Sequence, residues 1–250
     1  MSTPEFGLAD AAYRAFRPNY PPALFVAILA AVGPRRGVAV DLGAGTGLAT
    51  APLCPHFGRV IAVEPDAAMA SALAELASNV EVDPRDAESF SLEAGSADLV
   101  NAANCFYWFD GPAVADRIAQ WLRPGAVFAA IRYRFPGLTG AAREIIKREN
   151  EAHLDAFRHD RLRDEAYTKR TLRACKAFAE VSVHEIPCVN YLTPQAVAGF
   201  FASSSFGSAY ARSIGDSTYF DRLADELENS CGSSIESNAP LELVLARTAI

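Results

Sequence analysis

Short apolar runs alternate with helix-like segments over the first 135 residues of the chain. A helix is expected after Pro21-Pro22, because apolar residues recur there at helical spacing until Gly33-Pro34. Five strands are expected from apolar and β-branched content, at 38–42, 60–63, 80–82, 97–102 and 126–133. Further helices are expected from near Gly47, over 67–77 and over 112–122, the last followed by a turn at 123–125. Strands joined by helical crossovers predict a parallel sheet that is covered on both faces.

The pattern changes after the segment 135-FPG-137. Helices rich in Arg, Lys and Glu are expected over 140–179. A strand at 181–186, a helix from near Pro194 and a last strand at 241–248 complete the predicted elements. The chain therefore reads as one α/β domain with a helical segment after its fifth strand.

Composition and charge restrict the class of protein. Half of the 250 residues are hydrophobic and 21% are charged, as in ordinary globular proteins. A net charge of −7 argues against a non-specific binder of nucleic acid or of anionic membranes. No apolar stretch approaches the ~20 residues of a membrane span, and the start of the chain lacks the pattern of a signal peptide. The five scattered cysteines contain no CxxC pair, so we expect a reduced, cytoplasmic protein with no disulfide framework and no metal site.

The segment 43-GAGTG-47, directly after the first strand, is the main candidate for a ligand site. Glycines let a ligand approach the backbone, and the start of the next helix offers free N–H groups. A dinucleotide-binding loop has the form GxGxxG, but Leu48 occupies its third glycine position and Gly47 comes one residue early. Asp41, just before the loop, would repel a pyrophosphate and suits the cationic sulfonium and ammonium of S-adenosylmethionine. The charge pattern therefore favours the sulfonium cofactor.

Two further acidic residues follow the next strands. Glu64 ends the second strand, where a carboxylate can accept hydrogen bonds from a ribose diol in both cofactor families. Asp86, after the third strand, is placed to reach an adenine amino group, with the backbone of Ala87 beside it. The alternative for Asp86 is a turn or a helix cap.

Together these segments resemble the class I S-adenosylmethionine-dependent methyltransferases. The resemblance rests on 40-VDLGAGTG-47, 63-VEPDAAM-69, 85-RDAESF-90, 98-DLVNAANCFYWFD-110 and 122-LRPGAVFA-129, in this order and spacing. More narrowly, the segments 13-YRAFRPNYPPAL-24 and 191-YLTPQAVAGFFASSS-205 (the latter taken as a strand-six region) are similar to the small-molecule group that includes trans-aconitate methyltransferase-like proteins. The resemblance covers nearly the whole chain. It implies a Rossmann-like, doubly wound, seven-stranded sheet of order 3-2-1-4-5-7-6 with the last strand antiparallel, and a helical cap after strand five.

The resemblance also implies roles for individual residues around the cofactor. Residues beside its methionine part would be Asp41, Gly43, Ala44 and Gly45. Glu64 would hold the ribose, with Pro65 and Met69 near the adenine and with Asp86 and Ala87 at the adenine edge. Residues beside the sulfonium would be Asn101, Ala102 and Asn104. Tyr13 and Arg17 would close over the cofactor, with Arg17 a candidate for its carboxylate.

The sequence indicates the residues that bind the methyl acceptor less specifically than those that bind the cofactor. Aromatic residues after the fourth strand, Phe106 and Trp108, supply apolar area for a substrate wall, and Arg132 and Arg134 after strand five suit an acidic substrate. Core packing and a surface arginine pair are the alternatives. Relatives often carry His-Trp where this chain has Tyr107-Trp108, so Tyr107 is the candidate polar catalytic group. The four histidines are expected on the surface or in the core, which leaves no convincing general base.

We therefore expect a methyltransferase that acts on a small molecule, by O-methylation of a carboxylic acid or secondary metabolite, as a monomer or homodimer without nucleic acid or membrane. One alternative is a non-catalytic, regulatory protein that keeps the cofactor site, and another is an NAD(P)-dependent reductase. The expected organisation is a single domain in four parts: an N-terminal lid and helix (1–36), the cofactor-binding core (37–135), the helical cap (136–180) and C-terminal strands with substrate-side helices (181–250).

Overall fold

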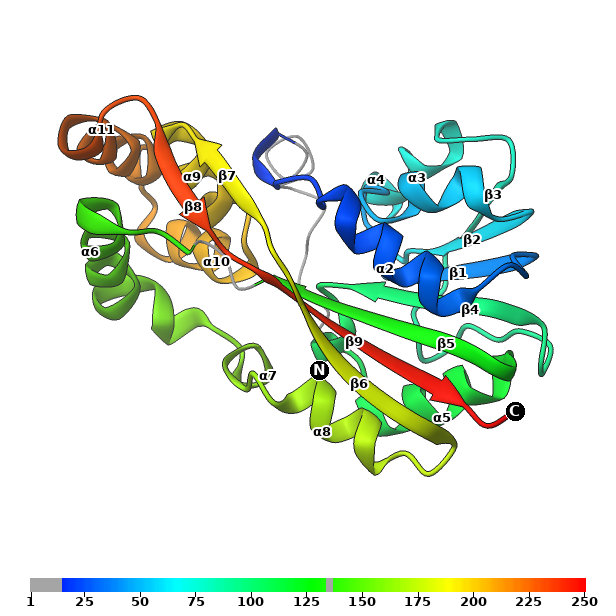
Figure 1. Cartoon of the computed structure of the whole chain (residues 1–250). Helices are drawn as coiled ribbons and strands as arrows, with labels where there is room; N and C mark the ends of the chain where they lie inside the picture. Colours follow the sequence, from blue (N-terminus) through cyan, green and yellow to red (C-terminus); the bar gives the residue numbers. More distant parts are fainter. Residues whose placement is uncertain (1–14, 134–136) are drawn as a thin grey trace. The chain divides into compact units, whose positions relative to one another are not determined.

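A computed structural model describes residues 15–133 and 137–250 (Figure 1). The chain divides into two compact units. In the described part, the sheet unit comprises residues 19–133, 164–186 and 241–250, and the second unit comprises 15–18, 137–163 and 187–240. The division of the chain into four parts stays a prediction.

The sheet unit contains a seven-stranded sheet of order β3-β2-β1-β4-β5-β9-β6. Its strands are β1 (Val38–Leu42), β2 (Arg59–Val63), β3 (Val80–Asp83), β4 (Ala97–Ala103), β5 (Leu122–Tyr133), β6 (Phe178–Ile186) and β9 (Leu241–Thr248). Strands β1 to β5 pair in parallel, whereas β9 runs antiparallel to both β5 and β6. The predicted order and the antiparallel last strand are confirmed, with β6 and β9 as the expected strands six and seven.

Helices cover both faces of this sheet. On one face lie α2 (Pro22–Val32), α3 (Thr50–Leu53) and α4 (Ala67–Ala70); on the other lie α5 (Gly111–Trp121) and α8 (Tyr167–Ala174) (Figure 1). Phe128 of β5 and Trp121 of α5 belong to the large buried core between the sheet and α5. Apolar residues of the central strands are buried on both faces of the sheet. A polar ligand site is therefore expected at the carboxyl ends of the parallel strands.

Three local expectations were wrong. The segment 123–125 is not a separate turn, since β5 begins at Leu122 and runs through it with a shift of register opposite β4. The helix from near Gly47 is only four residues long and passes into a 3₁₀ helix at Cys54–His56, because Pro55 has no N–H to continue it. The helix expected over 67–77 likewise ends at Ala70, and a 3₁₀ turn follows at Leu73–Glu75.

The second unit is mainly helical and has its own buried core. Its helices are α6 (Gly140–Glu149), a π-helical turn (Asn150–Leu154), a 3₁₀ turn (Asp155–Phe157), α7 (Asp160–Arg163), α9 (Pro194–Ala202), α10 (Ser205–Ile214) and α11 (Tyr219–Cys231). A two-stranded antiparallel sheet of β7 (Val189–Leu192) and β8 (Ile235–Asn238) was not predicted. The segment 191–205 therefore lies in β7 and α9 rather than in strand six. In the described part of the chain, no helix combines the length and apolar character needed to cross a membrane.

Candidate functional site

The glycine loop between β1 and α3 has a backbone conformation that residues with side chains rarely adopt. Gly43, Gly45 and Gly47 have φ of 62°, 57° and 89°, which L-residues with side chains rarely adopt. A Cβ on Gly43 would lie 2.9 Å from the Cβ and Sγ of Cys105. The N–H of Ala44 donates to the carbonyl of Val63 over 3.1 Å, which ties the loop to the end of β2. The loop is thus a fixed backbone surface at the carboxyl ends of β1 and β2.

Asp41 lies fully buried beneath this loop. Its Oδ2 accepts a hydrogen bond from the Thr50 hydroxyl at 2.6 Å, and its Oδ1 accepts one from the Asn101 amide at 2.7 Å. Burial raises the pKa of Asp41 to about 6, and the nearby charge of Glu64 also raises it, while the two hydrogen bonds oppose the shift. A buried carboxylate of this kind gains from a cationic ligand.

Glu64 is the second carboxylate at the loop, and it is 7% exposed. Its Oε2 accepts from the Gly45 N–H at 2.8 Å, and its Oε1 accepts from the Asp66 N–H at 2.9 Å. Burial raises the pKa of this carboxyl, and the two backbone N–H groups act in the opposite direction. Each oxygen still has a lone pair for a further donor such as a ribose hydroxyl.

Two buried polar atoms at this place have no hydrogen-bond partner among residues 15–133 and 137–250. They are the Thr46 hydroxyl in the glycine loop and Oδ1 of Asn101 on β4. Buried polar groups are normally satisfied, so such atoms point to a ligand or a water. With the two carboxylates and the open glycine backbone, this donor set fits the polar, cationic methionine part of S-adenosylmethionine.

Pro65 and Met69 follow Glu64 at the start of α4. Asp66 caps this helix by accepting from the N–H groups of Ala68 and Met69. Pro65 is exposed, and Met69 is buried. A Cβ on Gly45 would lie 3.9 Å from Sδ of Met69, which places the thioether beside the loop.

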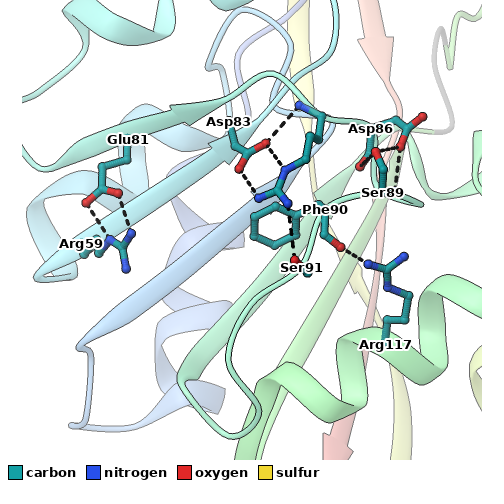
Figure 2. Close-up of polar contacts among 9 residues, drawn as sticks. Arg59, Glu81, Asp83, Asp86, Ser89, Phe90, Ser91 and Arg117 are labelled. Carbon is teal, nitrogen blue, oxygen red and sulfur yellow. Dashed lines mark hydrogen bonds and ion pairs between the residues drawn. The ribbon is translucent and has the colours of Figure 1, made fainter.

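Asp86 and Ala87 lie in the loop after β3, and Figure 2 shows Asp86 beside Ser89. The Asp86 carboxylate accepts from both the N–H and the hydroxyl of Ser89, so it performs the turn-capping role that was the alternative from the sequence. Both bonds use Oδ1. Asp86 is exposed and Ala87 is buried. The cap orients the carboxylate, and adenine binding by its other oxygen stays a prediction.

Asn104 directly follows β4 and has a left-handed conformation with φ of 56°. Its Nδ2 donates to the Tyr20 hydroxyl at 3.1 Å, and its Oδ1 accepts from the Tyr133 N–H at 2.8 Å. The Tyr20 and Tyr133 rings stack with centroids 5.0 Å apart. Asn104 therefore joins the ends of β4 and β5 to the segment before α2, whereas Ala102 is buried in β4.

The aromatic residues after β4 separate into buried and partly exposed members. Phe106 is 2% exposed and packs in the core, 5.4 Å from the ring of Phe128, so we leave it out of the proposed substrate site. Tyr107 and Trp108 are half-buried. The guanidinium of Arg132 lies over the Tyr107 ring at 5.5 Å and donates to the Asp164 carbonyl at 2.9 Å. Tyr107 and Arg132 thus form a contact pair within the sheet unit.

The remaining predicted site residues lie elsewhere. Tyr13 and Arg134 fall outside the described residues. Arg17 belongs to the second unit, where its guanidinium lies 4.3 Å over the Phe200 ring and donates to the Ser203 carbonyl at 3.5 Å. Its proposed contact with the cofactor carboxylate stays a prediction.

Sequence reasoning missed several residues that shape the site. Thr46 lies within the glycine loop and Thr50 begins the helix after it, and the hydroxyls of both lie at the site. Cys105 donates its S–H to the Leu42 carbonyl at 3.0 Å, and burial holds the pKa of this thiol well above its usual range. The thiol is therefore held protonated, which opposes thiolate chemistry at Cys105. Tyr20 lies just before the first helix, and its hydrogen bond with Asn104 spans 84 positions of the chain.

Comparisons with known proteins agree with the resemblance seen in the sequence. A family model described as a methyltransferase domain matches residues 40–130. An uncharacterized methyltransferase of Mycobacterium tuberculosis is 32% identical over 204 residues, which are 80% of this chain and 76% of that protein.

Solved structures show the same fold. A protein described as a type II methyltransferase from Anaeromyxobacter dehalogenans has a TM-score of 0.77 and 26% identity, covering 94% of this chain and 99% of its own. Phosphoethanolamine N-methyltransferase 2 of Haemonchus contortus, in complex with S-adenosyl-L-methionine, has a TM-score of 0.55 and 17% identity, covering 98% of this chain and 57% of its own. This second likeness is one of fold alone.

Proposed function

The chain belongs to the S-adenosylmethionine-dependent methyltransferases, and from this we propose that it methylates an oxygen of a small molecule, a carboxylic acid or a secondary metabolite. The trans-aconitate methyltransferase-like subgroup is part of this proposal. Family membership removes the reductase alternative. The observation that supports the cofactor site best is the pair of buried carboxylates, Asp41 and Glu64, at the glycine loop.

The cofactor supplies a methyl group on a cationic sulfonium. In our proposal Asp41 and the orphaned Oδ1 of Asn101 face the positively charged methionine part, and the Thr46 hydroxyl adds a hydrogen bond. Glu64 accepts from the ribose hydroxyls, because its carboxylate is already oriented by the Gly45 and Asp66 N–H groups. Met69 packs near the adenine, and Asp86 with Ala87 reads the adenine edge.

Catalysis by such a site depends on placing the acceptor oxygen in line with the methyl group and excluding water. A carboxylate acceptor is already ionised at neutral pH and needs no general base. Arg132 would attract an anionic acceptor, and the Tyr107 hydroxyl beside it would orient that acceptor. Trp108 would add apolar area.

The test is methyl transfer from radiolabelled S-adenosylmethionine to a panel of small carboxylic acids, phenols and amines. We expect label on an oxygen of an acid, and an Arg132→Ala variant to raise the KM for that acid. Tyr107→Phe should lower kcat/KM for the acid by about tenfold, as for the loss of one oriented hydrogen bond. Label on nitrogen or carbon alone would contradict O-methylation. Cofactor binding without transfer to any member of the panel would favour the regulatory alternative.

A further inference from the structure

A residue of helix α5 donates hydrogen bonds to the backbone of the loop that carries Asp86 and Ala87. Arg117 lies on this helix and donates from Nη1 to the Glu88 carbonyl and from Nη2 to the Phe90 carbonyl. Figure 2 shows the guanidinium of Arg117 directed at the Phe90 carbonyl. The Arg117 side chain therefore donates hydrogen bonds to two carbonyls of the segment 88–90, which directly follows Asp86 and Ala87.

Other contacts join the same loop to the sheet and to α5. The Glu88 carboxylate accepts from the Asp110 N–H, just before α5, at 2.8 Å. At the start of the loop, Arg85 pairs with Asp83 at 2.6 Å. The Phe90 side chain is 2% exposed and packs edge-on against Trp121 of α5, with centroids 5.0 Å apart. The loop is therefore fixed at both ends, and Arg117 holds the end next to the proposed adenine contacts.

Arginine suits this task for a geometric reason. Its planar guanidinium presents several N–H groups in a rigid fork, which can meet two acceptors at a fixed spacing. Its Cζ also lies 5.5 Å from the centroid of the Trp121 ring, so the side chain is supported on its own helix. A lysine at this position could not hold both carbonyls with one fixed geometry.

We propose that Arg117 is a positioning residue for recognition of the cofactor's base: by holding the Glu88 and Phe90 carbonyls, it sets the backbone of Ala87 and the carboxylate of Asp86 against the adenine edge. This inference rests on the proposed adenine site. Arg117 touches no part of the cofactor in this account. Its effect is on discrimination between bases, because adenine and hypoxanthine present opposite donors and acceptors at the edge that Asp86 and Ala87 would meet.

The experiment compares the affinities of S-adenosylhomocysteine and S-inosylhomocysteine by calorimetry. The wild-type protein should prefer the adenine compound by about tenfold or more, because the hypoxanthine compound leaves polar groups mismatched. Asp86→Ala should remove most of this preference. Arg117→Met should also bring the ratio of the two affinities close to one, and Arg117→Lys should give an intermediate ratio.

Arg59→Ala is the matched control, because Arg59 forms an exposed ion pair with Glu81 on the neighbouring strands and not with the loop (Figure 2). It should leave the ratio unchanged. If Arg117→Met lowers thermal stability but keeps the wild-type ratio, Arg117 supports only the fold and the inference is overturned. If the wild-type protein binds S-adenosylhomocysteine but does not discriminate between the bases, the adenine role of Asp86 fails. If it does not bind S-adenosylhomocysteine, the proposed cofactor site itself fails.

Hydrogen exchange provides a readout that needs no ligand and uses the milder variant. In ligand-free Arg117→Lys, amides 85–91 should exchange at least several-fold faster than in the wild-type protein, while the amides of β1 keep their rates. Equal exchange rates over 85–91 would overturn the proposal.

Discussion

The side-chain amide of Asn101 on β4 donates to the carboxylate of Asp41 on β1 across 2.7 Å, and both residues are fully buried. The parallel register pairs these two residues directly, although 60 positions separate them in the chain. The bond fixes the carboxylate under the glycine loop and leaves Oδ1 of Asn101 without a partner in the described part of the chain. A charged group and an unused acceptor are thus held at the place where we propose that the methionine part of the cofactor binds.

The buried Asp41 carboxylate should make stability depend on pH. Burial raises its pKa from 3.8 to about 6, so between these values the folded protein keeps a proton that the unfolded chain releases. The contribution of Asp41 to the free energy of unfolding therefore falls as pH rises through this window and is constant above it. The shift corresponds to roughly 3 kcal/mol. In urea denaturation, the free energy of unfolding of Asp41→Asn should rise by about this much relative to that of the wild-type protein between pH 4 and pH 7. If the two proteins show the same dependence of unfolding free energy on pH, Asp41 is not a buried, ionisable carboxylate.

Gly43 and Gly95 offer a matched test of the glycine loop. Both have positive φ, 62° and 67°, so alanine at either position carries a backbone cost of about 1 kcal/mol. A Cβ on Gly43 would also meet Cys105 at 2.9 Å, whereas a Cβ on Gly95 meets nothing within 4 Å. Gly43→Ala should therefore lower the unfolding free energy more than Gly95→Ala, and it alone should weaken S-adenosylhomocysteine binding. Equal losses of stability in urea denaturation would show that the loop tolerates a side chain.

The contact between Asn104 and Tyr20 can be measured by a double-mutant cycle. Tyr20→Phe removes the hydroxyl that accepts from Asn104 but keeps the ring stacked on Tyr133, so it should cost about 1 kcal/mol. Asn104→Ala should cost more, because it also removes the acceptor for the Tyr133 N–H at a position of positive φ. In the Asn104→Ala background, Tyr20→Phe should cost less than in the wild-type background. A cost as large as in the wild-type background would mean that the bond does not form.

Much of the fold could be predicted because the central strands are nearly continuous apolar runs. The strands at 38–42 and 241–248 match β1 and β9 residue for residue. The turn expected at 123–125 was wrong because Pro-Gly is a strong local turn signal, whereas the pairing of Leu122 with Ala97 of β4 extends β5 across this segment. Propensity is a local property, and the sheet partners are distant in the sequence.

Site residues could be predicted where their own position in the sequence indicates their role. They could not be predicted where the role depends on contact between residues that are distant in the sequence. Asp41 and Glu64 were found from their positions at strand ends beside the glycine loop. The orphaned acceptor of Asn101 became visible only once β4 was placed against β1. The sequence left core packing and a substrate wall both open for Phe106, because a run of aromatic residues does not show which rings point into the core; its burial favours the core. The role of Arg117 carries no local sequence signal, since its partners are backbone carbonyls 27 to 29 positions away.

The central claim is that S-adenosylmethionine binds at the glycine loop with Glu64 on its ribose. The most direct test is the dissociation constant of S-adenosylhomocysteine for the wild-type protein and for Glu64→Ala, measured by calorimetry on samples of equal thermal stability. The account predicts at least about tenfold weaker binding by the variant, because two hydrogen bonds to a charged acceptor are lost. An unchanged affinity would contradict the account and place the cofactor elsewhere.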